Sequence, residues 1–209
     1  MIFSLLAGWG SALAEEPTSA EQPASTLTAR QAKAAETFIR TKHNKVRAVL
    51  LQPDTPRRAN RLTELLGEFL DYEKLARLSL DREWDKRTPK ERARFVSLLR
   101  QLVERQYQRN MESTLKYKVS WVGTDLLGGE DVLVKSAARS HKNTRQPPIT
   151  IDYTMSPSGK EWRVWDIATD GVSLVKNYRR QFSRVNKDEG WSVLITRMEN
   201  RLNSTEEAP

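Results

Sequence analysis

The chain of 209 residues contains no cysteine. This absence excludes disulfide bonds, thiolate metal sites and cysteine nucleophiles, and it leaves the cellular compartment open. Histidine is almost as scarce: His43 and His141 each stand in a basic, polar neighbourhood, which favours surface positions over roles as catalytic bases. No apolar run approaches the roughly 18 residues that a membrane-spanning helix requires.

Recognisable catalytic motifs are also missing. The segment 171–175 resembles a nucleophile elbow, but its fifth position carries valine where the motif requires glycine. Ser173 within it has no evident histidine partner and is sufficiently explained as a helix-start residue. Asp152, Asp166 and Asp170 could supply a carboxylate pair, although hydrogen-bonded structural roles are favoured. With no glycine-rich phosphate loop after a strand and no metal-ligand spacing, the sequence predicts no catalytic residue, no metal and no cofactor.

Charge is unevenly balanced, with 35 Lys and Arg against 27 Asp and Glu, for a net charge of +8. Such an excess favours acidic partners: anionic lipid head groups, an acidic protein surface or nucleic acid. Basic side chains gather on an expected helix at 89–111, as Arg92, Arg94, Arg100, Arg105 and Arg109. A nucleic-acid interface is one interpretation. Because Glu91 and Glu104 interrupt the arginines, a solvated helix face is preferred.

The N-terminal segment indicates export. Residues 2–14 are apolar or small, and Ala12-Leu13-Ala14 has the form of a signal-peptidase site. A disordered apolar tail is the alternative. We expect 1–14 to be a signal peptide that is truncated, with the true start upstream, because no basic region precedes it. Residues 15–27 are expected to form a flexible leader, 28–202 a single domain and 203–209 a polar tail.

Periodicity predicts an α+β fold. Apolar spacings of three and four, with Thr28, Asp71 and Thr88 as expected caps, indicate helices. These helices are expected at 28–51, 57–70, 71–80, 89–111, 171–186 and 188–202. A period of two from Tyr117 onward indicates four strands with short connections, the last at 161–167. Consecutive strands of this kind predict a four-stranded antiparallel meander with helices packed on one face.

The segment 162–182 carries a family resemblance. It reads Trp162-Arg-Val-Trp165-Asp-Ile, then Asp170-Gly-Val-Ser-Leu-Val, then Asn177-Tyr-Arg and Gln181-Phe. This closely resembles the MlaC-type family, also called toluene-tolerance proteins, whose members typically read W-x-V-Y-D-V, E-G-V-S-L-V and N-Y-R-x-Q-F. Trp165 replaces the usual Tyr and Asp170 the usual Glu, so size or charge is kept. Residues 71–76, Trp84 and Thr88-Pro89 extend the resemblance over about 60–202.

The resemblance implies a soluble periplasmic phospholipid carrier that is not an enzyme. It implies an NTF2-like cone in which the sheet and helices enclose an apolar cavity. It further implies shuttling of lipid between the outer and inner membranes, which maintains outer-membrane lipid asymmetry. The implied partners are a phospholipid, the MCE-domain subunit of an inner-membrane ABC transporter and an outer-membrane lipoprotein complex, with no nucleic acid.

Apolar residues on the inward faces are the candidate lipid contacts once the resemblance is accepted. They are Phe95, Leu99, Leu102, Tyr107, Val134, Ile149, Ile151, Val164, Leu174 and Tyr178. Periodicity alone does not distinguish a packed interior from a lined cavity. Two alternatives stay open: an NTF2-like small-molecule enzyme, which would need an acid/base carboxylate at the cavity floor, and a carrier of another lipid such as a hopanoid.

Overall fold

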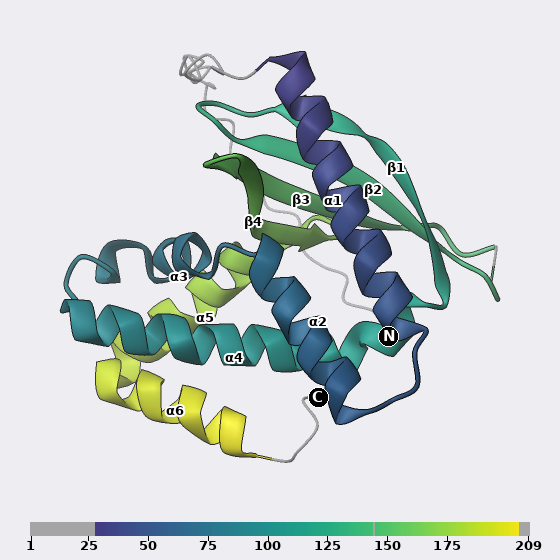
Figure 1. The fold of residues 1–209 in the computed structure, drawn as a ribbon. Helices are drawn as coiled ribbons and strands as arrows, with labels where there is room; N and C mark the ends of the chain where they lie inside the picture. Colours follow the sequence, from purple (N-terminus) through teal and green to yellow (C-terminus); the bar gives the residue numbers. More distant parts are fainter. Residues whose placement is uncertain (1–27, 144, 205–209) are drawn as a thin grey trace, which may run out of the picture.

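The computed structural model describes residues 28–143 and 145–204, except for the side chains of 109–113. The expected signal peptide, leader and last part of the polar tail lie outside these residues. The described helices are α1 (Ala29–Leu50), α2 (Pro56–Phe69), α3 (Tyr72–Leu80), η1 (Asp81–Glu83), α4 (Pro89–Thr114), α5 (Leu174–Glu189) and α6 (Trp191–Asn203). The strands are β1 (Tyr117–Leu126), β2 (Val132–Ser140), β3 (Ile149–Ser158), β4 (Glu161–Thr169) and β5 (Val172–Ser173). The predicted α+β architecture is confirmed (Figure 1).

Helices α1, α3 and α4 begin directly after residues whose side chains cap the helix N-terminus. Thr28 and Gln31 form a reciprocal capping box at the start of α1. At α3, the Asp71 carboxylate accepts a hydrogen bond from the backbone N–H of Lys74 at 2.8 Å. At α4, the Thr88 hydroxyl accepts from the backbone N–H of Glu91, whose carboxylate accepts from the Thr88 N–H at 2.8 Å. Local sequence therefore specifies these helix starts.

The sheet is an antiparallel meander in the order β1-β2-β3-β4-β5, and it is bent by two irregularities in register. Trp121 and Gly123 of β1 oppose consecutive residues of β2, which leaves Val122 as the extra residue. Trp165 is likewise extra in β4, between Val164 and Asp166. A bulge adds one residue to one strand, so it moves the inward-facing positions from even to odd numbers or the reverse.

The short β5 strand was not predicted, since the expected helix at 171–186 included it. Asp170 and Gly171 have positive φ angles of 47° and 77°, which suits a two-residue hairpin loop. Val172 and Ser173 then pair with Thr169 and Ala168 of β4 before α5 begins. Gly190, with φ 90°, separates α5 from α6, so these helices also end and begin later than predicted.

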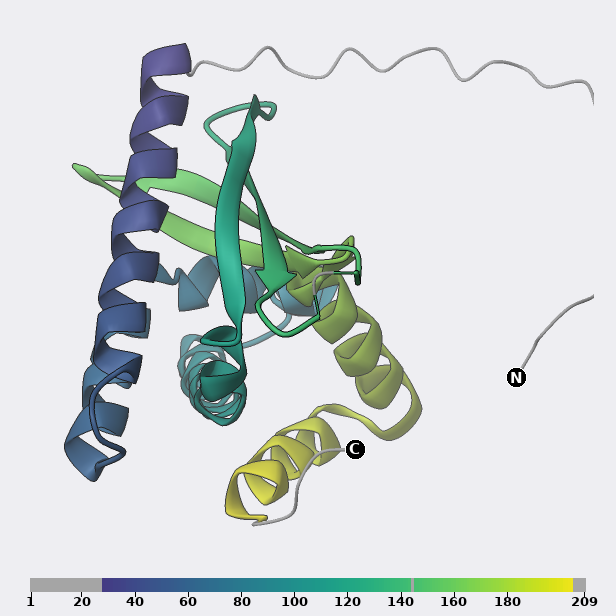
Figure 2. The ribbon, with the colours of Figure 1, turned by 90° about the vertical axis from the view of Figure 1, so that its right-hand side faces the viewer.

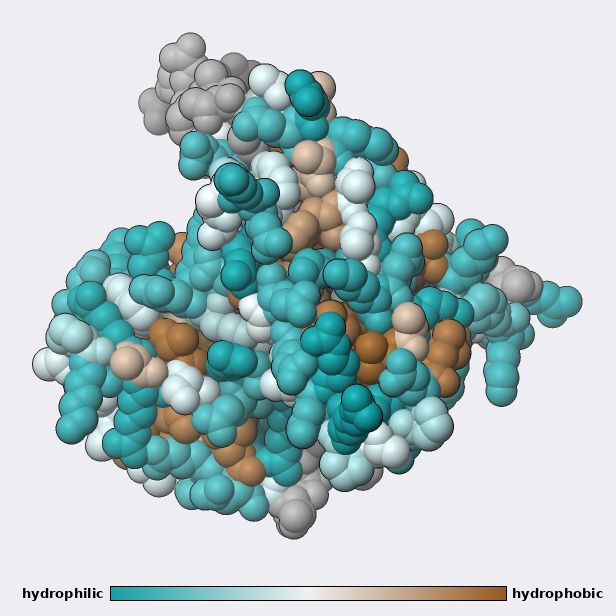
Figure 3. Space-filling model, in the orientation of Figure 1, coloured by the Kyte–Doolittle hydropathy of each residue, from teal (hydrophilic) through white to brown (hydrophobic). Residues whose placement is uncertain are grey.

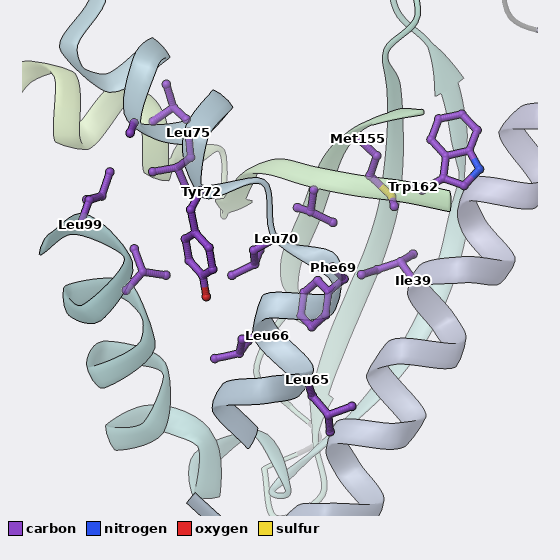
Figure 4. Packing of buried hydrophobic residues seen from close by; sticks show 14 of the residues in the cluster. Ile39, Leu65, Leu66, Phe69, Leu70, Tyr72, Leu75, Leu99, Met155 and Trp162 are labelled. Atoms are coloured by element: carbon purple, nitrogen blue, oxygen red, sulfur yellow. The ribbon is translucent and has the colours of Figure 1, made fainter. Parts of the chain in front are cut away.

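The helices pack in two groups, which Figures 1 and 2 show from two sides. Helix α1 crosses one face of the sheet and contacts β1, β2 and β4. Helices α3, α4, α5 and α6 pack on one another below the sheet, around the fully buried Phe95 and Leu99. Figure 4 shows Leu75 and Leu99 in the second group, while Ile39 and Met155 lie between α1 and the sheet.

The four arginines of α4 whose side chains the structure describes are occupied by protein partners. Arg94 pairs with Glu199 of α6, and Arg100 pairs with Glu104 at 2.7 Å. Arg105 donates to three backbone carbonyls at the end of α6, and Arg92 donates to the Trp84 carbonyl at 2.9 Å. These contacts favour the interpretation of this face as a structural surface rather than a nucleic-acid interface.

Ser173 holds the start of α5. Its hydroxyl accepts from the Lys176 N–H at 3.0 Å and donates to the Asp166 carboxylate at 2.6 Å. Asp166 also accepts a hydrogen bond from the Val175 N–H at 3.0 Å, so the start of α5 after β4 depends on these two side chains. Asp170 accepts from the Thr150 N–H at 2.8 Å. The structural roles predicted for Asp166, Asp170 and Ser173 are confirmed.

We expect Ser173→Ala to lower the free energy of unfolding by about 1 kcal/mol, because the helix loses its cap. Chemical denaturation followed by circular dichroism measures this change. Ser97→Ala, at an exposed position inside α4, is the matched control and should change stability by less than about 0.5 kcal/mol. Equal effects of the two substitutions would contradict the capping role.

Candidate functional site

A cavity of about 510 Å³ lies between one end of the sheet and the helices. Its wall comes from the second half of α1, the end of α2, the end of α4, the start of α5 and strands β1 to β5. Figure 2 shows α1 and α5 on opposite sides, with α4 seen end on between them below the strands. The volume is typical of small-molecule sites, which range over about 300–1,000 Å³.

The inner face of the sheet is divided between packed core and cavity. Towards the β1–β2 turn, Val132, Val134, Met155 and Val164 are all fully buried and lie outside the cavity wall. Towards the other end, the same face continues as apolar residues of the wall. These residues are Val119, Ala138, Ile149, Ile151 and Ile167. Of the predicted lipid contacts on strands, Ile149 and Ile151 therefore line the cavity, and Val134 and Val164 do not.

The bulge at Trp165 determines which residue of β4 follows Val164 on the inward face. Val164 opposes Met155, and Ile167 opposes Tyr153 on the next inward position of β3. Inward residues of β4 are thus even-numbered before the bulge and odd-numbered after it. Ile167 and Thr169 line the cavity for this reason, whereas an unbroken alternation from Trp162 and Val164 would place Asp166 on the inward face.

The apolar stripes of α4 and α5 are divided in the same way. On α4, Tyr107 lies in the cavity wall, whereas Phe95 and Leu99 are fully buried between helices and Leu102 packs against that core. The Phe95 ring meets the Phe182 ring edge to face at 5.3 Å. On α5, the predicted Leu174 and Tyr178 line the cavity. The structure therefore brings five of the ten predicted residues together at the cavity: Tyr107, Ile149, Ile151, Leu174 and Tyr178.

Three of the four tyrosines in the cavity wall have raised pKa values and therefore supply neutral polar groups. Burial raises the pKa of Tyr107 to about 12 and also raises the pKa values of Tyr153 and Tyr178. The Tyr178 ring stacks on Phe182 at 5.2 Å, which joins the cavity wall to the helical core. Hydroxyl groups in these positions offer hydrogen bonds without placing charge in an apolar site.

Sequence reasoning missed His43 and Arg47, which also line the cavity. His43 was expected at the surface, but it is half-buried and its ring meets Trp121 edge to face at 6.0 Å. Burial, and then the charge of Arg47, lower the pKa of His43. The sequence contains an indication of this position, because His43 lies between Ile39 and Val46 on the apolar stripe of α1.

The described lining residues include no Asp or Glu. Asp166 lies close by, but Ser173 and the Val175 N–H use its two carboxylate oxygens. Within residues 28–143 and 145–204, no group of three or more His, Asp or Glu side chains could hold a metal ion. The arrangement is suited to holding an apolar ligand rather than to acid–base chemistry.

The exterior contrasts with this cavity. The face in Figure 3 is mainly hydrophilic, and its hydrophobic patches are separated by polar residues. Among the described helices, none combines the length and apolar character needed to cross a bilayer.

Three comparisons place the chain among known proteins. The comparison with curated proteins found no match. Among solved structures, the chain is similar to a phospholipid-binding protein from Ralstonia solanacearum in complex with a phospholipid, with a TM-score of 0.70. The sequences are 21% identical, and the alignment covers 81% of this chain and 97% of the other. At this identity the likeness establishes a shared fold.

The family comparison extends beyond the fold. A family model described as "MlaC protein" matches residues 40–200, which is most of the chain and includes all of the cavity-lining residues except Ile39. The match agrees with the resemblance found in the segment 162–182. This protein belongs to the MlaC family.

Proposed function

We propose that the protein is a periplasmic phospholipid carrier that holds the acyl chains of its ligand in the cavity at the end of the sheet. The observation that carries the proposal is a largely apolar wall with no described carboxylate, in a member of the MlaC family. Each buried methylene is worth about 0.8 kcal/mol. A lipid therefore leaves a membrane readily only for a site that buries most of its chains, and we propose that this wall is that site.

The structural relative supports the same ligand class, because it was solved in complex with a phospholipid and shares the fold over 81% of this chain. In the proposed cycle, the protein shuttles lipid between the outer and inner membranes and so helps maintain outer-membrane asymmetry. The proposed partners are the MCE-domain subunit of an inner-membrane ABC transporter and an outer-membrane lipoprotein complex.

The competing NTF2-like enzyme is less well supported. Its mark would be a carboxylate at the cavity floor, and the described lining carries none. Ser173 does line the cavity, but its hydroxyl is occupied as the cap of α5. A carrier needs no catalytic group, and we propose that this chain uses none.

We expect the protein purified from a bacterial periplasm without detergent to contain a diacyl phospholipid. The apolar wall retains acyl chains through purification because their return to water is unfavourable. Native mass spectrometry would show a mass above that of the chain alone, and extraction followed by lipid analysis would identify the ligand. A spectrum with only the apo mass would count against the carrier function, and a hopanoid would favour the alternative cargo.

Substitutions at Ile167 and Val164 of β4 should distinguish a residue that lines the cavity from a residue of the packed core. Ile167→Asp places a carboxylate in the cavity wall, so we expect loss of bound lipid with the fold retained. Val164→Asp buries an unpaired carboxylate in packed core, so we expect destabilisation by several kcal/mol. Tyr107→Glu should behave like Ile167→Asp. Lipid content and thermal melting are measured on each variant. Full lipid occupancy in Ile167→Asp and Tyr107→Glu would show that the ligand lies elsewhere.

The rate of phospholipid transfer between membranes should not depend on the Ser173 hydroxyl. We expect Ser173→Ala to move fluorescent phospholipid between vesicles at the wild-type rate below its melting temperature, and neither protein to release fatty acid. The physical reason is that the Ser173 hydroxyl is engaged by Asp166 and by the α5 backbone. Fatty-acid release by the wild type that disappears in Ser173→Ala would instead identify a hydrolase.

A further inference from the structure

Arg47 is an unusual member of the cavity wall. It lies near the end of α1, half-buried, among the apolar residues Val46 and Leu50 of the same helix. Apart from Arg47 and His43, the described lining residues carry no ionisable group other than tyrosine hydroxyls. The cavity therefore combines an extensive apolar wall with one permanent positive charge, since a guanidinium does not lose its proton in proteins.

Three other cations of α1 have carboxylate partners, whereas none is found for Arg47 among the described residues. Lys33 and Arg40 both contact Glu36, at 2.8 and 3.1 Å, and Lys42 contacts Glu68 at 2.9 Å. In the described part of the chain, the Arg47 guanidinium makes no hydrogen bond or ion pair. A charge removed partly from water is unfavourable unless a partner compensates it. An anion that entered the cavity would supply that partner.

The groups around Arg47 define which anion fits. His43 lies four residues earlier on α1, so both side chains are on the same side of the helix. With its lowered pKa, His43 is neutral at pH 7 and offers one N–H without adding charge. Arginine forms paired hydrogen bonds with planar or tetrahedral oxyanions, phosphate among them. The apolar wall beside these groups requires that the anion be attached to a hydrophobic tail.

We propose that Arg47, assisted by His43, binds the phosphodiester of a phospholipid whose acyl chains fill the cavity. This site rests on the proposed carrier function and adds to it a basis for selecting phosphorylated over neutral lipids. A half-buried position suits this role, because the phosphate keeps contact with water while the chains leave it. Apolar surface alone would accept a diacylglycerol as readily as a phospholipid.

A competition between two lipids tests the site. The protein is incubated with vesicles of dioleoylphosphatidylglycerol that contain a minor fraction of dioleoylglycerol, then separated, and its bound lipids are quantified by mass spectrometry. We expect the wild type to prefer the phospholipid relative to the vesicle composition. Arg47→Met should reduce that preference about tenfold, since a hydrogen bond to a charged group is lost while the apolar stem is kept. Arg47→Lys should retain part of it, because the charge is kept while the paired hydrogen bonds are lost.

Lys45→Met is the matched control. Lys45 is exposed on the same helix and lies outside the cavity wall, so its removal changes net charge equally and should leave the preference unchanged. An Arg47→Met protein with the wild-type preference would overturn the phosphate site and leave the carrier function standing. A wild type that takes up neither lipid would overturn both. If Arg47→Met does not fold, Arg47→Gln is measured in its place and judged by the same outcomes.

Discussion

The free edge of β4 is the constraint on which the arrangement around the cavity depends. An unpaired strand edge exposes backbone groups that need partners. Here the Asp71 N–H donates to the Val164 carbonyl at 2.8 Å, and further along β5 pairs with Ala168 and Thr169. The first contact fixes the junction of α2 and α3 at this edge, and the second fixes the start of α5. Helices that are far apart in the sequence are thereby held around one end of the sheet.

The bulge at Trp165 stands between these two contacts and is itself held in place. The Trp165 indole N–H donates to Asp131 at 3.3 Å, and the Lys74 ammonium lies over the indole ring at 4.6 Å. Lys74 also contacts Asp131 at 3.0 Å, which ties α3 to the β1–β2 turn. Because this bulge sets which residues of β4 face inward, the Lys74–Asp131–Trp165 contacts help determine that Ile167, rather than Asp166, faces the cavity.

Much of the fold could be predicted because its signals are local. Caps such as Thr28 and Thr88, and the alternation along β2, act within a few residues. The division between core and cavity is not local. Val134 and Ile151 have the same character in the sequence and face the same side, yet the first is fully buried and the second lines the cavity. That difference depends on which parts of the sheet the helices pack against, which periodicity does not record.

Arg47 shows how a single polar side chain can add ligand selectivity to a cavity whose wall is otherwise largely apolar. A wall of aliphatic and aromatic residues holds acyl chains by burial, a force without direction that distinguishes ligands mainly by size. A single cation in that wall adds direction, because it favours a ligand whose negative charge lies at a defined distance from its chains. It adds no catalytic group, so the lipid can be released unchanged. In the proposed carrier, the cavity would thus combine strong non-directional burial with a weaker polar contact that orients the ligand.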